Sequence, residues 1–216
     1  LDTDIAQTMP KKLVAHTGMD ALTHSIEAYT ACNRSPFTDP LALQAISDIF
    51  DSLVDSYNGD EKARAKMHYA QCLAGMAFSN ALLGIAHSLA HKTGAMFNIP
   101  HGCCNAILLP FVIQYNSRVC MERYAAIAKM AGLPGRTDKQ LTDSLVEAIR
   151  GLNKKLSIAP TYRENGVSEE NFKANAKTIA KNAVLDPCTG ANPRKTDAEA
   201  MEKVLTCAYY GEDVTF

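Results

Sequence analysis

The chain has 216 residues, of which 47% are hydrophobic and 21% charged, and its formal net charge at pH 7 is −1. This is the composition of an ordinary globular domain that is long enough to bury a substantial core. Because it has no run of Lys or Arg and no apolar segment of membrane-spanning length, the sequence predicts a soluble protein with no nucleic-acid or membrane partner.

Helical periodicity dominates the first half of the chain. Pro10 suits the start of a short helix that ends near His16, and a second helix is expected from Thr17-Gly18 to about Thr30. The Ser35-Pro36 and Asp39-Pro40 steps then interrupt the chain. Further helices are predicted over residues 41–57, which Asn58-Gly59 would end, and over residues 61–80.

The second half is also predicted to be helical. One helix is expected over residues 84–98, where Pro100 disfavours continuation, and another over residues 102–115 with a bend at Pro110. Capping boxes at Thr137-x-x-Gln140 and Thr196-x-x-Glu199 mark two later helix starts, and residues 186–193 read as a loop. With no strand signal, no repeat and no long linker, residues 1–216 are predicted to form one all-α domain, a helical bundle.

The seven cysteines are odd in number and form no C-x-x-C motif, which argues against a disulfide framework or a cysteine-type zinc site. A reducing, cytoplasmic location fits this pattern, and the adjacent Cys103 and Cys104 are expected to be buried thiols. The first residues, Leu1 to Asp4, lack every feature of a secretion signal and suggest a chain cut from a longer one.

Four metal-ligand side chains occur as two pairs with helical spacing. Asp20 and His24 are four residues apart on one predicted helix, and His87 and His91 have the same spacing on another. Side chains at this spacing share a helix face, so two such helices can build a metal site between them. His101 follows the break at Pro100 and can reach the same space. Imidazole and carboxylate suit zinc or ferrous iron, and spacing alone leaves five candidates for one ion.

The simpler interpretation is that these are hydrogen-bonded core histidines and a surface ion pair. The Ala, Leu, Ile and Met residues around them favour a metal, because buried polar groups need partners. The remaining histidines are expected to be structural, with His68 at the surface and His16 at most in a supporting role. The sequence contains neither H-E-x-x-H, a phosphate-binding P-loop nor G-x-G-x-x-G, so no metalloprotease or dinucleotide-binding motif competes.

Residues 9–29, and residues 75–91 together with 100–102, resemble the two long signatures of the iron-containing alcohol dehydrogenases. Residues 105–110 and 192–194 extend the likeness, which spans the chain and is strongest to butanol dehydrogenases and to the alcohol dehydrogenase half of bifunctional aldehyde–alcohol dehydrogenases. The resemblance implies the helical C-terminal domain of a dehydroquinate synthase-like fold.

The resemblance also implies a site. Its metal ligands fall on Asp20, His24, His87 and His101, for Fe²⁺ or alternatively Zn²⁺. His91 falls beside the nicotinamide and the substrate as the catalytic histidine, and both His91 and His101 are expected to contact the cofactor. Phe78 and Phe97 are candidates for an apolar wall of the substrate pocket. Because ligating histidines must be neutral, metal binding should weaken as the pH falls through about 6.

The implied reaction is interconversion of a small primary alcohol and its aldehyde with NAD or NADP. In this family an N-terminal α/β domain binds the nucleotide, and no such domain occurs in residues 1–216. We therefore expect this chain to be inactive toward alcohol by itself and to form a homo-oligomer. The alternatives are a non-catalytic metal-binding or structural module, and a sister enzyme of the glycerol dehydrogenase type.

Overall fold

The computed structural model describes all 216 residues and contains helices but no strand, which confirms the all-α prediction. Two 3-10 helices, η1 (Asp4–Ala6) and η2 (Pro187–Ala191), accompany eight α-helices. In chain order these are α1 (Lys11–Thr30), α2 (Thr38–Asn58), α3 (Glu61–Ala81), α4 (Ile85–Phe97), α5 (His101–Met130), α6 (Asp138–Lys155), α7 (Glu169–Val184) and α8 (Ala198–Tyr210).

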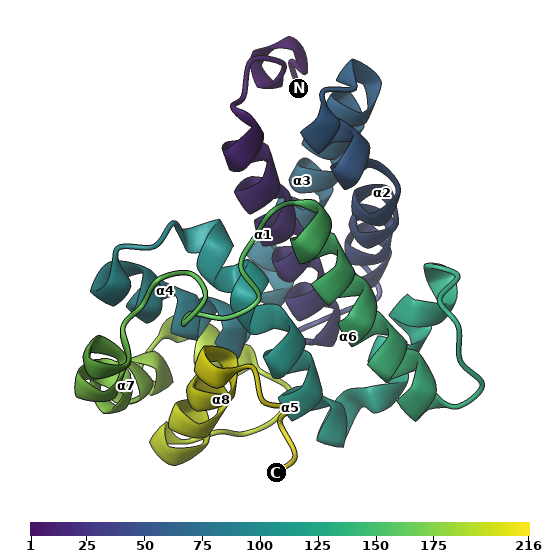
Figure 1. Ribbon diagram of the computed structural model, residues 1–216. Coiled ribbons are helices and arrows are strands. Elements are labelled where there is room, and N and C mark those ends of the chain that lie inside the picture. Colours follow the sequence, from purple (N-terminus) through teal and green to yellow (C-terminus); the bar gives the residue numbers. More distant parts are fainter.

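The helices form two groups that meet along α1 and α5 (Figure 1). Helices α1, α2 and α3 pack on one another at the end of the molecule that carries the N-terminus. At the other end α4 packs on α5 and α7, and α8 packs on α7 and α5. Helix α6 lies along α5. One continuous apolar core runs through both groups, so α1 and α4 are held against the same central helix.

Helix α1 is one helix of 20 residues, and the predicted break at Thr17-Gly18 is wrong. Glycine is a poor helix former, but Gly18 stays helical because α2 packs closely over it. A Cβ atom at this position would overlap the side chain of Leu53 on α2. Asp20, His24 and Glu27 therefore lie on one continuous helix.

Helix α5 runs well past the predicted end at residue 115, and its irregular residue is Cys120 (φ −142°, ψ 37°), not Pro110. Proline cannot donate to the carbonyl four residues earlier, which here belongs to Ala106. The side-chain amide of Asn153 on α6 donates to that carbonyl over 2.7 Å. The neighbouring helix therefore replaces the missing hydrogen bond, and α5 continues through Pro110.

The helix ends follow the local chemistry with one exception. Gly59 ends α2 in the left-handed region (φ 102°), and the capping box of Thr137 and Gln140 begins α6, both as predicted. The second predicted capping box is wrong, because Asp197 rather than Thr196 accepts the N–H of Ala200 at the start of α8. The expected loop at 186–193 contains η2.

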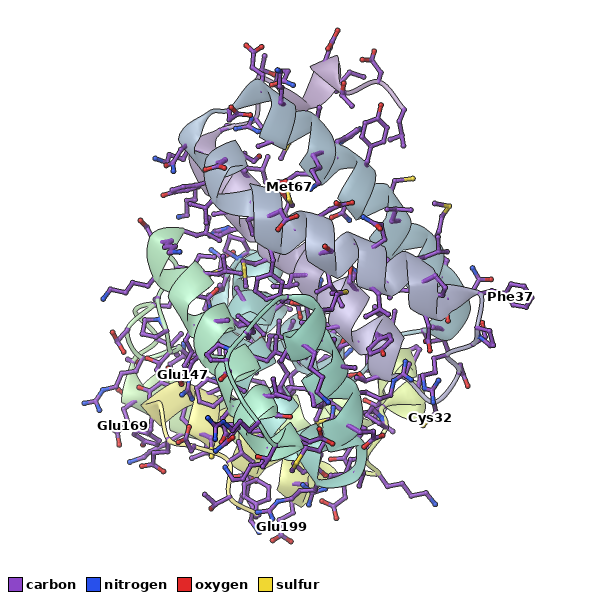
Figure 2. All side chains as sticks on the ribbon, turned by 90° about the vertical axis from the view of Figure 1, so that its right-hand side faces the viewer. Cys32, Phe37, Met67, Glu147, Glu169 and Glu199 are labelled. Carbon is purple, nitrogen blue, oxygen red and sulfur yellow. The ribbon has the colours of Figure 1, made fainter.

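Burial separates the interior from a few exposed apolar side chains. Figure 2 shows Phe37 projecting from the connection between α1 and α2, where 85% of it is exposed, whereas Met67 on α3 is buried. Cys103 and Cys104 are buried as predicted, and all seven cysteines are free thiols. No single helix has the length and apolar character needed to cross a membrane; only α3 and α4 together meet that criterion, with a bend of 106° between them.

Candidate metal centre

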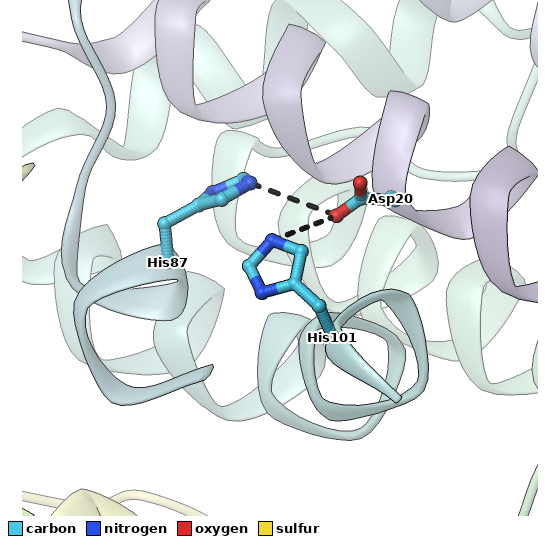
Figure 3. A group of neighbouring side chains, drawn as sticks. All are labelled: Asp20, His87 and His101. Carbon is cyan, nitrogen blue, oxygen red and sulfur yellow. Dashed lines mark ion pairs between the residues drawn. The ribbon is translucent and has the colours of Figure 1, made fainter. Parts of the chain in front are cut away.

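Three of the predicted ligands converge where α1, α4 and α5 meet. Asp20 on α1, His87 on α4 and His101 at the start of α5 place one donor atom each within 4.8 Å of one another. Figure 3 shows both imidazoles directed at the same carboxylate oxygen of Asp20. The Nε2 atoms of His87 and His101 lie 3.7 and 3.4 Å from that oxygen. His87 and His101, which follow Asp20 by 67 and 81 positions in the chain, thus face the same point.

His24 lies at the edge of this cluster. Its Nδ1 atom is 3.9 Å from the second carboxylate oxygen of Asp20, and its ring is tilted against that of His87 with 4.3 Å between centroids. On the other side it stacks on Phe78 at 4.4 Å. The predicted apolar wall at Phe78 therefore borders the site, whereas Phe97 packs against Tyr162 and lines a different cavity with His16.

Two nitrogen atoms at this point have no hydrogen-bond partner. Nδ1 of His24 and Nε2 of His87 are both buried and unpaired, and His87 is only 1% exposed. A buried polar atom without a partner costs about 1–3 kcal/mol, so two such atoms side by side call for a shared partner. Three imidazoles and one carboxylate are donors that Fe²⁺ and Zn²⁺ accept, so the residues present fit a divalent metal ion.

The electrostatics of the metal-free cluster are uneven. Burial disfavours the charge on Asp20, but the nearby imidazoles of His87 and His24 outweigh this effect and lower the Asp20 pKa to about 2. Burial and the charge of His87 lower the pKa of His24 to about 4. Burial also lowers the pKa of His101. At neutral pH these three groups are therefore in the protonation states that bind metal.

His87 differs from the other histidines because it lies between two carboxylates. Burial alone would lower its pKa, but the carboxylates of Asp20, 3.7 Å from Nε2, and of Glu27, 2.6 Å from Nδ1, raise the pKa to about 9. Nδ1 of His87 is 2.6 Å from Glu27, which is 4% exposed. A metal ion at Nε2 must therefore displace a proton at neutral pH. The weakening of metal binding near pH 6 stays a prediction, and this contact moves its expected onset for His87 to higher pH.

His91 lies next to the cluster but outside it. Its ring stacks on His101 with 5.2 Å between centroids, and its Nδ1 atom is 2.9 Å from Asp186, at the start of η2. Lys92 also binds Asp186, over 2.8 Å. His91 is thus paired with a different carboxylate, which agrees with its predicted separation from the ligands.

The sequence did not identify three polar residues that hold these histidines and Asp20. Glu27 contacts His87, Asp186 contacts His91, and Asn105 donates to Asp20 over 2.7 Å. Asn105 is fully buried. Glu27 and Asn105 each lie on the same helix as a ligand, three residues after His24 and four after His101, which was the only local signal of their role.

The two histidines predicted to be structural lie elsewhere. His16 is buried and its backbone carbonyl touches Gly102, where a Cβ atom would overlap it, so Gly102 allows α5 to start close to α1. Its side chain lines a cavity of about 410 Å³ with Lys12 and Cys103. His68 is half-buried rather than at the surface, and it lines a second cavity, of about 320 Å³.

Known proteins share this sequence and fold. A family model described as the Fe-containing alcohol dehydrogenase family, C-terminal, matches residues 14–209. An NADPH-dependent butanol dehydrogenase of Clostridium saccharobutylicum is 58% identical over 216 residues, which are 100% of this chain and 56% of that protein. An aldehyde-alcohol dehydrogenase of Streptococcus pneumoniae is 41% identical over 98% of this chain and 26% of its own length.

Among solved structures, the iron-containing alcohol dehydrogenase from Thermococcus thioreducens superimposes with a TM-score of 0.90 at 36% identity. The match covers 98% of this chain and 54% of that one. The chain thus spans from a quarter to about half the length of these relatives. The family match over most of the chain and the shared fold lead to one conclusion: this chain belongs to the Fe-containing alcohol dehydrogenase family and corresponds to its C-terminal, helical part.

Proposed function

We propose that this chain is the metal-binding part of an NAD(P)-dependent alcohol dehydrogenase, with Asp20, His24, His87 and His101 as the ligands of a divalent ion. The convergence of Asp20, His87 and His101, with the buried and unpaired Nε2 atom of His87, is the observation that supports it most directly. The family of the chain favours Fe²⁺, and Zn²⁺ is the alternative because it accepts the same donors.

The overall reaction converts a primary alcohol and NAD(P)⁺ into an aldehyde, NAD(P)H and a proton. When bound, a divalent ion supplies positive charge that lowers the pKa of a neighbouring hydroxyl group. Phe78 shields one side of the site from water by stacking on His24. The Nδ1 atom of His91 is held by Asp186. We infer that the Nε2 atom of His91 is therefore available to bind the alcohol substrate or to transfer the proton of the substrate hydroxyl group.

We propose that the nicotinamide nucleotide is bound mainly by residues beyond these 216. The aligned region covers only 56% of the butanol dehydrogenase, and the sequence of this chain has no dinucleotide-binding glycine motif. His91 and His101 would then face the nicotinamide across the junction of the two parts, because both are about 40% exposed beside the buried His87. The names of the relatives support a small alcohol or aldehyde as substrate.

The test is elemental analysis of the chain purified without oxygen, followed by titration of the metal-free chain with Co²⁺. We expect one divalent ion per chain and the visible spectrum of a histidine-containing site. Alcohol-dependent reduction of NAD⁺ and NADP⁺ is then measured with the chain alone and with a nucleotide-binding domain of the family added. Activity only in the second mixture is the expected result, whereas a chain that binds no divalent ion would contradict the proposal.

A further inference from the structure

Glu27 makes an unusual set of contacts for a buried carboxylate. It lies on α1, one turn beyond His24, and has no Lys or Arg among its hydrogen-bond partners. Instead it accepts the backbone N–H of Gly84 over 3.0 Å, the N–H of Ala86 over 2.8 Å and a bond from Nδ1 of His87 over 2.6 Å. All its partners therefore lie in the first turn of α4 or just before it.

The first backbone N–H groups of a helix have no partner inside the helix and carry partial positive charge. Glu27 satisfies two of these groups, and Asn192 accepts the N–H of Ile85 between them over 3.3 Å. A Cβ atom at Gly84 would lie 2.8 Å from both Glu27 and Asn192, so only glycine lets the chain come this close. The start of α4 is thus held against α1 by the same carboxylate that contacts His87.

The bond to Nδ1 decides which nitrogen of His87 can bind a metal ion. A carboxylate is only an acceptor, so the proton of this bond lies on Nδ1 of the imidazole. In the neutral ring Nε2 then carries the lone pair, and Nε2 is the buried, unpaired atom that faces Asp20 and His101. A carboxylate on the far nitrogen also makes an imidazole a stronger donor.

We propose that Glu27 is a positioning residue: it fixes His87 as the Nδ1–H tautomer and ties the start of α4 to α1, which directs Nε2 of His87 at the metal site. This inference rests on the proposed metal centre. It assigns to one side chain both the chemical form of a ligand and the placement of the helix that carries it. Asp20 and Glu27 lie seven residues apart on α1, so one helix face supplies the ligand and the group that orients its partner.

The first experiment measures the imidazole nitrogens of His87 by ¹⁵N NMR in the chain loaded with Zn²⁺. We expect the proton on Nδ1, with the downfield proton resonance of a short hydrogen bond and slow exchange with water, and the metal on Nε2. This measurement needs no substitution. Zn²⁺ bound at Nδ1, or an Nδ1 atom without a proton, would overturn the inference.

The second experiment compares Glu27→Gln with the wild-type chain. A glutamine has one oxygen and one NH₂ group, so it cannot satisfy all three N–H donors, and it carries no charge. We expect the Nδ1 proton resonance to move upfield and to exchange faster, and the affinity for Zn²⁺ to fall about 10- to 100-fold. An unchanged resonance with unchanged affinity would refute the proposal.

The matched control is Asn192→Ala, which removes the acceptor of the Ile85 N–H in the same helix turn; the Asn192 side chain bonds Asn116 and Arg194 but makes no hydrogen bond to Glu27 or His87. We expect a lower melting temperature with the Nδ1 resonance and the Zn²⁺ affinity retained. If both variants lose the metal equally while the Nδ1 proton stays unchanged, Glu27 acts only through the stability of α4, and the inference is wrong. If Nδ1 carries its proton and no Zn²⁺ binds to the wild-type chain, the metal centre fails while the tautomer assignment stands.

Discussion

His91 and Asp186 are 95 residues apart in the chain, yet Nδ1 of His91 lies 2.9 Å from Oδ2 of Asp186. Only 4% of the Asp186 side chain is exposed, whereas 39% of the His91 side chain is exposed. The contact orients an accessible histidine of the site by means of a buried anion. It connects α4 to the segment that leads into η2.

Substituting Asp186→Asn should lower stability at neutral pH and remove part of its acid dependence. Burial opposes the charge of Asp186, but hydrogen bonds from Lys92, His91 and the N–H of Cys188 lower its pKa from 3.8 to about 2. A lowered pKa stabilises the fold above pH 4, and this contribution is lost as the pH falls through about 2. It is on the order of 2 kcal/mol.

Urea unfolding of the wild-type chain and the Asp186→Asn variant at a series of pH values measures this difference. The two stabilities should converge as the pH falls from about 4 to 2. A difference that stays constant over this range would show that the carboxylate charge contributes nothing.

Substituting His87→Ala should abolish binding of Co²⁺, whereas His91→Ala should keep it. The Nε2 atom of His87 points into the cluster with Asp20 and His101, and His91 instead bonds Asp186. Titration followed by visible absorption measures both variants, with circular dichroism to confirm that each is folded. Equal loss of Co²⁺ in the two variants would contradict the ligand assignment.

The affinity of the chain for Zn²⁺ should rise with pH up to about pH 9, roughly tenfold per unit. The neighbouring carboxylates of Asp20 and Glu27 outweigh burial and raise the His87 pKa to about 9, so the ion competes with a proton at Nε2 below that pH. His24 and His101 have lowered pKa values and contribute no step at neutral pH. Isothermal titration calorimetry in buffers of different ionisation enthalpy measures the affinity and also detects the released proton. An affinity for Zn²⁺ that levels off near pH 6.5 would contradict the raised pKa of His87.

Substituting Gly18→Ala should destabilise the chain by about 1–3 kcal/mol, because the new methyl group overlaps Leu53 where α1 crosses α2. Gly75→Ala is the matched control. Gly75 is also inside a helix, and a Cβ atom there has no neighbour within 4 Å, so this change should stabilise by about 0.5–1 kcal/mol. Chemical denaturation of both variants measures the difference, and equal effects would show that the helix contact at Gly18 tolerates a methyl group.

The helical class of this protein and the residues that meet at its site could be predicted from the amino-acid sequence. Helical spacing pairs Asp20 with His24 and His87 with His91 because residues four apart share a helix face. The resemblance to a known family then separated His91 from the ligands. Helix starts with a strong local signal, such as the capping box at Thr137, also followed from the sequence.

The groups that surround those histidines could not be predicted, because they depend on how the helices pack. Glu27 reaches His87 across 60 residues and Asp186 reaches His91 across 95, and no local spacing encodes either contact. The same holds for continuity of helices, because packing of Leu53 over Gly18 and the bond from Asn153 to Ala106 override weak local helix signals. The protonation of a histidine depends on its burial and on the partners that folding brings to it. For this reason the histidines of the site differ in their environments, although their side chains are identical.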